Sequence, residues 1–113
     1  MYQALAKYNE IPPFAEFGYE PQTTFWGDFG VADVLGGAKA IKDTFNRSFK
    51  NWKDDKVYGT ELAMVLNHKS WEWYAKNNEE LAKLYTELYS KLDQYIMDNW
   101  KGEDLSYYLR VTD

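Results

Sequence analysis

Apolar residues recur every three or four positions between residues 28 and 53, which is the spacing of one face of an α-helix. At ~100° per residue, they predict one core-facing stripe, namely Val31, Val34, Ala38, Ile41, Phe45, Phe49 and Trp52. Asp28 stands at the start of this stretch and is expected to be the N-cap, because its carboxylate can accept hydrogen bonds from free backbone N–H groups. Gly36 and Gly37 interrupt the stripe, and two adjacent glycines cost a helix on the order of 2 kcal/mol relative to alanine. They indicate either a break in the helix or a place where another backbone comes close.

A second helix is expected over residues 60–76, with Thr60 as its N-cap. This stretch is apolar on two sides: one consists of Leu62, Val65, Leu66 and Trp73, and the other of Ala63, Met64, Trp71 and Tyr74. A middle helix wedged between two neighbours explains the pattern, and this interpretation is favoured. A helix with one face in the core and the other at an oligomer interface explains it too. Trp71 is the residue expected at a partner surface.

A third helix is expected from Asn77 or Asn78, either of which can cap it, to about residue 100, and Gly102 ends it. Glu80 follows Asn77 at the spacing of a capping box. The predicted core face is Leu81, Leu84, Tyr85, Leu88, Leu92, Tyr95 and Ile96. Charged residues repeat every four positions on the outside, where ion pairs contribute ~0.2–0.5 kcal/mol each; they are Glu79, Lys83, Glu87 and Lys91.

The two ends of the chain carry less regular patterns. Residues 1–27 contain three prolines and many aromatic residues, so an irregular segment packed on the helices is expected there. The tail 103–113 alternates as a strand does but fits a short helical turn equally well, and the helix is favoured. The prediction is therefore an all-α fold: one domain, 1–113, with a compact three-helix antiparallel core and a short C-terminal helical turn.

Composition supports a folded chain and limits its chemistry. Of 113 residues, 45% are hydrophobic, and 5 Trp, 10 Tyr and 6 Phe supply either core or contact surface. The absence of cysteine excludes disulfides and thiolate metal sites. No signal peptide and no apolar stretch of ~20 residues is present, which predicts a cytoplasmic protein without membrane contact. The net charge of −5 opposes non-specific nucleic-acid binding.

The triplet Asp28-Phe29-Gly30 is the one that binds magnesium in protein kinases. A chain of 113 residues is less than half the length of a kinase domain, and it has neither a Gly-rich phosphate loop nor a His-Arg-Asp catalytic loop. The triplet is therefore interpreted as the start of a helix.

A metal site has one weak candidate pair, His68 and Glu72, spaced i, i+4 on the second helix. Glu61 lies within ~40° of them on the helical wheel but roughly 10 Å from His68 along the axis, too far for a shared coordination shell. A di-iron bundle needs a Glu-x-x-His motif on each of two helices, and this chain has a single histidine. The favoured interpretation is a polar strip with a His–Glu pair, and no cofactor is expected.

A row of lysines is expected along the first helix, within ~80° on the wheel. Its members are Lys39, Lys42, Lys50 and Lys53. A solvated helix face is the favoured interpretation, because Asp43 and Asp54 dilute the positive charge. Docking of a nucleic acid, or of an acidic partner such as another copy of the chain, stays open.

Four stretches, TTFWGDFGVAD, IKDTFNRSFKNWK, TELAMVLNHK and LSYYLRVTD, together resemble a family of short proteins of unknown function. That family is encoded by gut bacteria, their phages and other mobile elements. The resemblance covers the chain from about residue 23 to its end. It implies a mostly helical single domain of bacterial or phage origin, and it supplies no catalytic residues.

The leading hypothesis is a non-enzymatic domain that binds another protein or associates with itself as a homo-oligomer. It is motivated by the surplus of aromatic residues, by a helix that is apolar on two sides and by the lack of an assembled active site. The alternatives are a small metal-dependent enzyme using His68 and Glu72, and a nucleic-acid-linked regulator using the lysine row.

Overall fold

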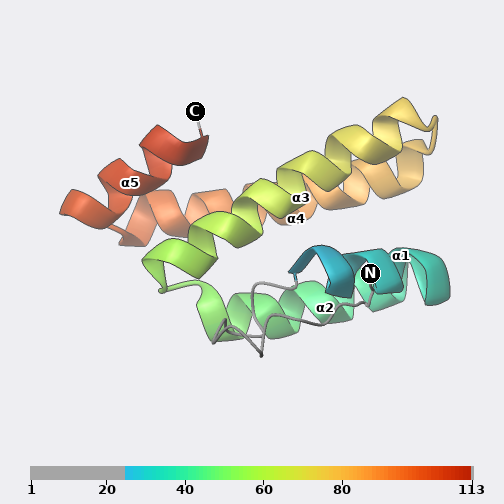
Figure 1. Ribbon diagram of the computed structural model, residues 1–113, viewed down its shortest axis with the longest axis horizontal. Coiled ribbons are helices and arrows are strands. Elements are labelled where there is room, and N and C mark those ends of the chain that lie inside the picture. The colour runs from blue at the N-terminus through green and yellow to red at the C-terminus, as the bar shows by residue number, and fades with distance from the viewer. Residues whose placement is uncertain (1–24, 113) are drawn as a thin grey trace, which may run out of the picture.

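The computed structural model describes residues 25–112, which form five helices and no strand. These are α1 (Phe25–Leu35), α2 (Gly37–Trp52), α3 (Lys56–Ala75), α4 (Glu79–Asn99) and α5 (Gly102–Thr112). Helices α3 and α4 lie side by side as a long antiparallel hairpin, and α1 folds back along α2 beneath it (Figure 1). Helix α5 packs near the beginning of α3. The all-α prediction is confirmed.

The helix expected over residues 28–53 is in fact two helices that meet at Gly36 and Gly37. Gly37 has φ +63°, in the left-handed region that glycine adopts at little cost, and α1 ends just before it at Leu35. Of the two interpretations of the double glycine, the break is therefore correct. It lets α1 reverse onto α2 instead of extending it (Figure 1).

The break changes which residues of α1 face the core. Val31 and Val34, expected in the core, are 57% and 81% exposed. Phe25, Phe29 and Ala32 are buried in their place. The expected stripe was derived for one continuous helix. Because the chain reverses between α1 and α2, the positions that face the core in α2 do not predict those that face it in α1. The α2 part of the stripe is confirmed as core or core-packed: Ala38, Ile41, Phe45, Phe49 and Trp52.

The helix starts also differ from the expected ones. Asp28 lies within the first turn of α1 and is not its N-cap, because the helix begins three residues earlier, at Phe25. Helix α3 begins one turn before Thr60, and the carboxylate of Asp55 caps it by accepting a hydrogen bond from the backbone N–H of Tyr58 at 2.9 Å. Thr60 is therefore buried inside the helix.

Asn78 is the N-cap of α4, where its side-chain oxygen accepts from the backbone N–H of Leu81 at 3.1 Å. Asn77 instead has φ +63°, and this left-handed residue turns the chain from α3 into α4. The capping box from Asn77 to Glu80 is therefore absent. Within residues 25–112, the expected ion pairs along α4 do not form; they would have joined Glu79, Lys83, Glu87 and Lys91.

The core lies between the α3–α4 hairpin and the α1–α2 pair. Fully burying a large apolar side chain stabilises a fold by about 1.5–3 kcal/mol. The predicted face of α4 is confirmed for Leu81, Leu84, Tyr85, Leu88, Leu92 and Ile96, which are buried, while Tyr95 is half-buried. From α3, the buried apolar residues are Leu62, Ala63, Val65 and Leu66.

The C-terminal tail is helical, as favoured from its sequence. Gly102, with φ +58°, lets the chain turn out of α4, and α5 runs from there to Thr112. Tyr108 is buried and donates a hydrogen bond of 2.5 Å to Asp93. The predicted irregular segment 1–27 lies outside the described residues up to position 24, and residues 25–27 already belong to α1.

Gly59 gives the first testable prediction, because α3 passes close to Trp52 and Trp100 there. A Cβ at Gly59 would lie 2.8 Å from the Trp52 carbonyl oxygen and 2.9 Å from the Trp100 ring. Gly30→Ala is a matched control, since a Cβ at Gly30 meets nothing within 4 Å.

Both glycines are helical, so replacement by Ala improves helix propensity by a similar amount at each position. The difference in free energy of unfolding between the two variants therefore reports the clash at Gly59. We expect Gly59→Ala to be about 1–3 kcal/mol less stable than Gly30→Ala, the usual cost of overpacking. Urea denaturation followed by circular dichroism measures this difference. Equal stability of the two variants would contradict the close packing at Gly59.

Candidate functional site

A buried ion pair joins α1 to the α3–α4 hairpin. The Lys69 ammonium nitrogen lies 2.5 Å from a carboxylate oxygen of Asp33, and their side chains are only 6% and 3% exposed. The other carboxylate oxygen accepts a hydrogen bond of 2.5 Å from the hydroxyl of Tyr85. Buried charges are tolerated when they are paired and hydrogen-bonded, and both conditions are met here.

The surroundings keep the Tyr85 hydroxyl protonated. Burial, followed by the hydrogen bond to Asp33, raises the pKa of Tyr85 far above its usual range, so the hydroxyl stays a donor. The Lys69 ammonium also lies 5.9 Å from the ring centre of Trp73 and 6.0 Å from that of Tyr85. Such cation–π contacts add to the stability of a desolvated ammonium.

The side of α3 that points away from the core carries exposed apolar residues. Val57, Met64 and Trp71 are exposed and follow one another at intervals of seven, which places them along one side of a helix. Tyr74 lies one turn after Trp71, and these two side chains are 62% and 65% exposed respectively. We call these four residues the α3 outer face.

Neighbouring helices continue this apolar surface. Trp26 of α1 and Val111 of α5 are exposed and line hollows together with Met64. The favoured interpretation, a helix wedged between two neighbours, fails for Met64, Trp71 and Tyr74, because none of the described helices covers them. The second apolar side is exposed at these three residues, while its Ala63 is buried.

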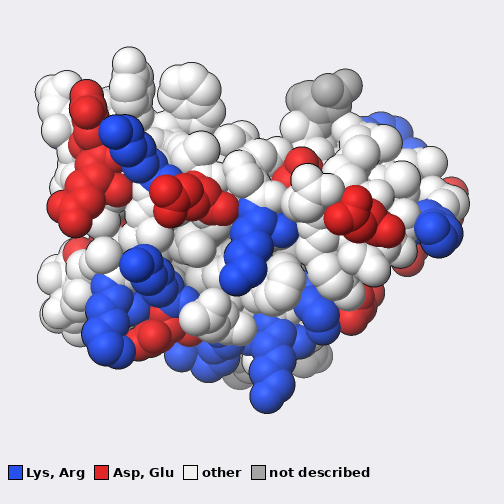
Figure 2. All heavy atoms as spheres, turned by 180° about the vertical axis from the view of Figure 1, so that it is seen from behind, with Lys and Arg blue, Asp and Glu red and all other residues white. Residues whose placement is uncertain are grey.

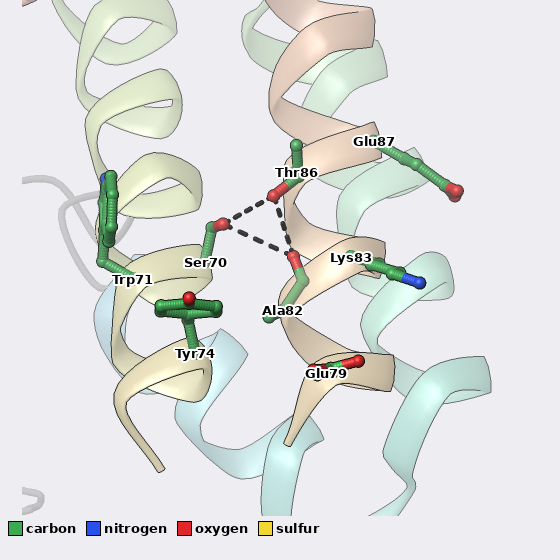
Figure 3. Close-up of a pocket in the computed structure, with 8 residues that line it drawn as sticks. All are labelled: Ser70, Trp71, Tyr74, Glu79, Ala82, Lys83, Thr86 and Glu87. Atoms are coloured by element: carbon green, nitrogen blue, oxygen red, sulfur yellow. Dashed lines mark hydrogen bonds between the residues drawn. The ribbon is translucent and has the colours of Figure 1, made fainter. Parts of the chain in front are cut away.

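A hollow of about 600 Å³ opens at the end of the α3 outer face, between α3 and α4 (Figure 3). Trp71 and Tyr74 form two of its walls, with ring planes at 90° and ring centres 6.1 Å apart. Its floor is polar: the hydroxyls of Ser70 and Thr86 lie 2.6 Å apart. Thr86 donates to the Ala82 carbonyl at 2.9 Å. Glu79, Lys83 and Glu87 of α4 complete the lining of what we call the Trp71–Tyr74 pocket.

The weak metal candidates have different partners. The ring of His68 packs edge-on against Trp26, with ring centres 4.8 Å apart. Glu72 forms ion pairs with Lys69 at 3.4 Å and Lys76 at 3.1 Å. Burial opposes ionisation of Glu72, but the hydrogen bonds and charges of these two lysines outweigh it and lower its pKa. Across residues 25–112, no group of three or more potential ligands is arranged to hold a metal ion.

The lysine row lies along α2, where basic side chains gather at the lower edge of Figure 2. Lys39 pairs with Asp43 at 2.9 Å, and Lys53 pairs with Asp54 at 3.3 Å. The other two members, Lys42 and Lys50, are exposed. The two aspartates that were expected to dilute the row therefore do so by direct contact.

The buried Asp33–Lys69 pair and the Ser70–Thr86 contact were not predicted from the sequence. A signal for the pair existed: Lys69 continues the helical spacing of Leu62 and Leu66 and thus stands on the core face of α3. A charged residue on such a face indicates a buried partner. The Ser70–Thr86 contact joins two helices, and no pattern within either helix predicts it.

Comparison of the chain with protein-family models, with curated proteins and with solved structures found no match. Within residues 25–112, no helix combines the length and the apolar character needed to cross a membrane.

The buried ion pair gives the second prediction. Asp33→Asn removes the buried counter-charge of Lys69 and leaves the partly exposed Glu72 carboxylate, 3.4 Å away, as its partner. Breaking a buried pair costs about 3–5 kcal/mol of unfolding free energy. Lys69→Met is expected to cost a similar amount. The double variant should cost less than the sum of the two, because no unpaired charge remains.

Lys76→Met is the control, since it breaks an exposed pair with Glu72 on the same helix. It should cost no more than about 1 kcal/mol. Chemical denaturation measures the free energy of unfolding of each of the four variants and of the wild type. If Asp33→Asn has the same free energy of unfolding as Lys76→Met, the buried pair contributes little to stability.

Proposed function

We propose that this chain is a small non-enzymatic helical domain that binds another protein through the α3 outer face. The observation that carries the proposal is the exposure of Trp71 and Tyr74 beside a hollow, on a helix whose opposite side is core. Tryptophan and tyrosine are the residues most enriched at interface hot spots. Exposed apolar patches with a polar rim are typical of interaction sites.

The spacing of the surface favours an elongated partner segment. Val57, Met64 and Trp71 extend over four turns of α3, so a partner helix or extended peptide would contact them in succession. The hollow at Trp71 would accept one larger side chain of that segment. A second copy of this chain is one partner that fits this description, as expected for a self-associating domain.

The two alternatives have less support from the geometry. The enzyme hypothesis needs His68 and Glu72 at one ion, and these side chains instead contact Trp26 and two lysines. The nucleic-acid hypothesis needs a free row of lysines, and two of the four are paired with aspartates. Neither alternative makes use of the exposed aromatic residues.

The third prediction concerns Trp71. Tagged wild-type protein, Trp71→Ala and Met97→Ala are used as baits in nuclease-treated lysate of the source organism. Met97 is a matched control, because it is an exposed apolar residue on α4 outside the α3 outer face. We expect wild type and Met97→Ala to retain the same stoichiometric protein, and Trp71→Ala to lose it.

Sedimentation of the purified variants covers the case in which the partner is a second copy. Concentration-dependent association that Trp71→Ala abolishes supports the proposal equally. Thermal unfolding checks that Trp71→Ala is still folded. Partners retained unchanged by Trp71→Ala, or the absence of both capture and self-association in all three proteins, would contradict the proposed function.

A further inference from the structure

The two aromatic walls of the Trp71–Tyr74 pocket meet as a corner. Both rings line the hollow, and Figure 3 shows them edge-on, one upright and one lying flat. The planes are perpendicular, with ring centres 6.1 Å apart. A cation is attracted to the face of an aromatic ring within about 6 Å of its centre. A single cation placed in this corner can therefore contact both rings.

The protein's own cations occupy many of its other aromatic rings. Lys76 lies 4.9 Å from the ring centre of Trp73, and Lys56 lies 5.3 Å from that of Tyr107. Among the residues that the structure describes, no lysine or arginine lies over Trp71 or Tyr74. Within residues 25–112, both rings are therefore available to a cation from another molecule.

The remaining lining residues offer acceptors and negative charge. Glu79, Lys83 and Glu87 line the pocket from α4, so carboxylates outnumber ammonium groups there, and in Figure 3 the side chains of Lys83 and Glu87 point away from the two rings. Both glutamates are exposed, and their side chains can rotate to follow a bound cation. On the floor, the Ser70 and Thr86 hydroxyl oxygens have lone pairs that accept hydrogen bonds.

These features favour a guanidinium over an ammonium. A guanidinium is planar and stacks on an aromatic face, and its five N–H groups donate in the plane while none accepts. Stacked on Trp71, it would direct donors to the floor oxygens, and a glutamate side chain would have to rotate towards the rings to accept another. An ammonium is more strongly hydrated and loses more on leaving water.

We propose that the Trp71–Tyr74 pocket receives an arginine side chain of the partner protein. This inference rests on the proposed function, since it names the residue that the α3 outer face recognises. A volume of about 600 Å³ exceeds that of one side chain, so neighbouring residues of the partner segment also fit at the opening.

The test is a titration of the isotope-labelled full chain, followed by the NMR signals of the tryptophan indole N–H groups. The probe is N-acetyl-arginine amide, and its matched neutral control is N-acetyl-citrulline amide, which has nearly the same shape without the charge. Trp71→Ala identifies the signal of Trp71. Sodium chloride keeps the ionic strength equal in all samples.

We expect a saturable shift of the Trp71 signal with the arginine probe and about two- to fivefold weaker binding of citrulline, the factor that a cation–π contact of 0.5–1 kcal/mol gives at an exposed site. The double variant Glu79→Gln, Glu87→Gln should bind the arginine probe more weakly than the wild type does, and Met97→Ala should bind it as the wild type does. Equal binding of the two probes, no shift, or a shift of other tryptophans only would overturn the inference.

The titration requires no partner, so its failure can be told apart from failure of the proposed function. If the probes bind equally while Trp71→Ala still loses its captured protein, the interaction surface stands and the arginine preference is wrong. If the arginine probe binds as expected while no protein depends on Trp71, the pocket binds cations and the proposed function is wrong.

Discussion

Lys69 brings a full positive charge into the centre of the helices, and the arrangement of α1 depends on how that charge is neutralised. Among residues 25–112, Asp33 supplies the buried counter-charge, and it reaches Lys69 because α1 is folded back, while Glu72 adds a partly exposed carboxylate. The Tyr85 hydroxyl then holds the second carboxylate oxygen from α4. Three helices thus meet at one carboxylate, and an apolar contact at this place would fix their relative positions far less strictly, because it has no preferred direction.

The parts of the fold that could be predicted are those governed by one helix at a time. The core face of α4 follows from periodicity, and the all-α class follows from the same pattern in three stretches. The reversal at Gly36 and Gly37 was one of two readings of the sequence, because the local cost of two glycines does not tell where the chain goes next. Val31 and Val34 were misplaced for that reason. Helix starts moved by up to a turn where Asp55, a stronger cap than Thr60, was available upstream.

One residue of the candidate site could be predicted from the sequence, but the geometry of the site could not. Trp71 belongs to a second apolar side of α3 that the sequence shows plainly, and the structure leaves it exposed. The pocket beside it needs the pairing of α3 with α4, which brings Ser70 next to Thr86, sixteen positions along the chain. The pairing of His68 with Glu72 was expected from their i, i+4 spacing alone. His68 instead packs against Trp26, and Glu72 pairs with Lys69 and Lys76. Helical spacing determines which side chains can come together, and packing determines which of them do.

The short connection between α3 and α4 bears on the order in which the molecule assembles. Residues 76–78 alone separate these two helices, so beginning to pair them closes a short loop and needs little loop-closure entropy. Attachment of α1 joins Asp33 to Tyr85, which are 52 positions apart. The hairpin is therefore expected to form early and α1 to dock late. Because Val57, Met64, Trp71 and Tyr74 all belong to the hairpin, the chain would present its exposed aromatic surface before its core is closed, and a partner engaged during synthesis could meet that surface first.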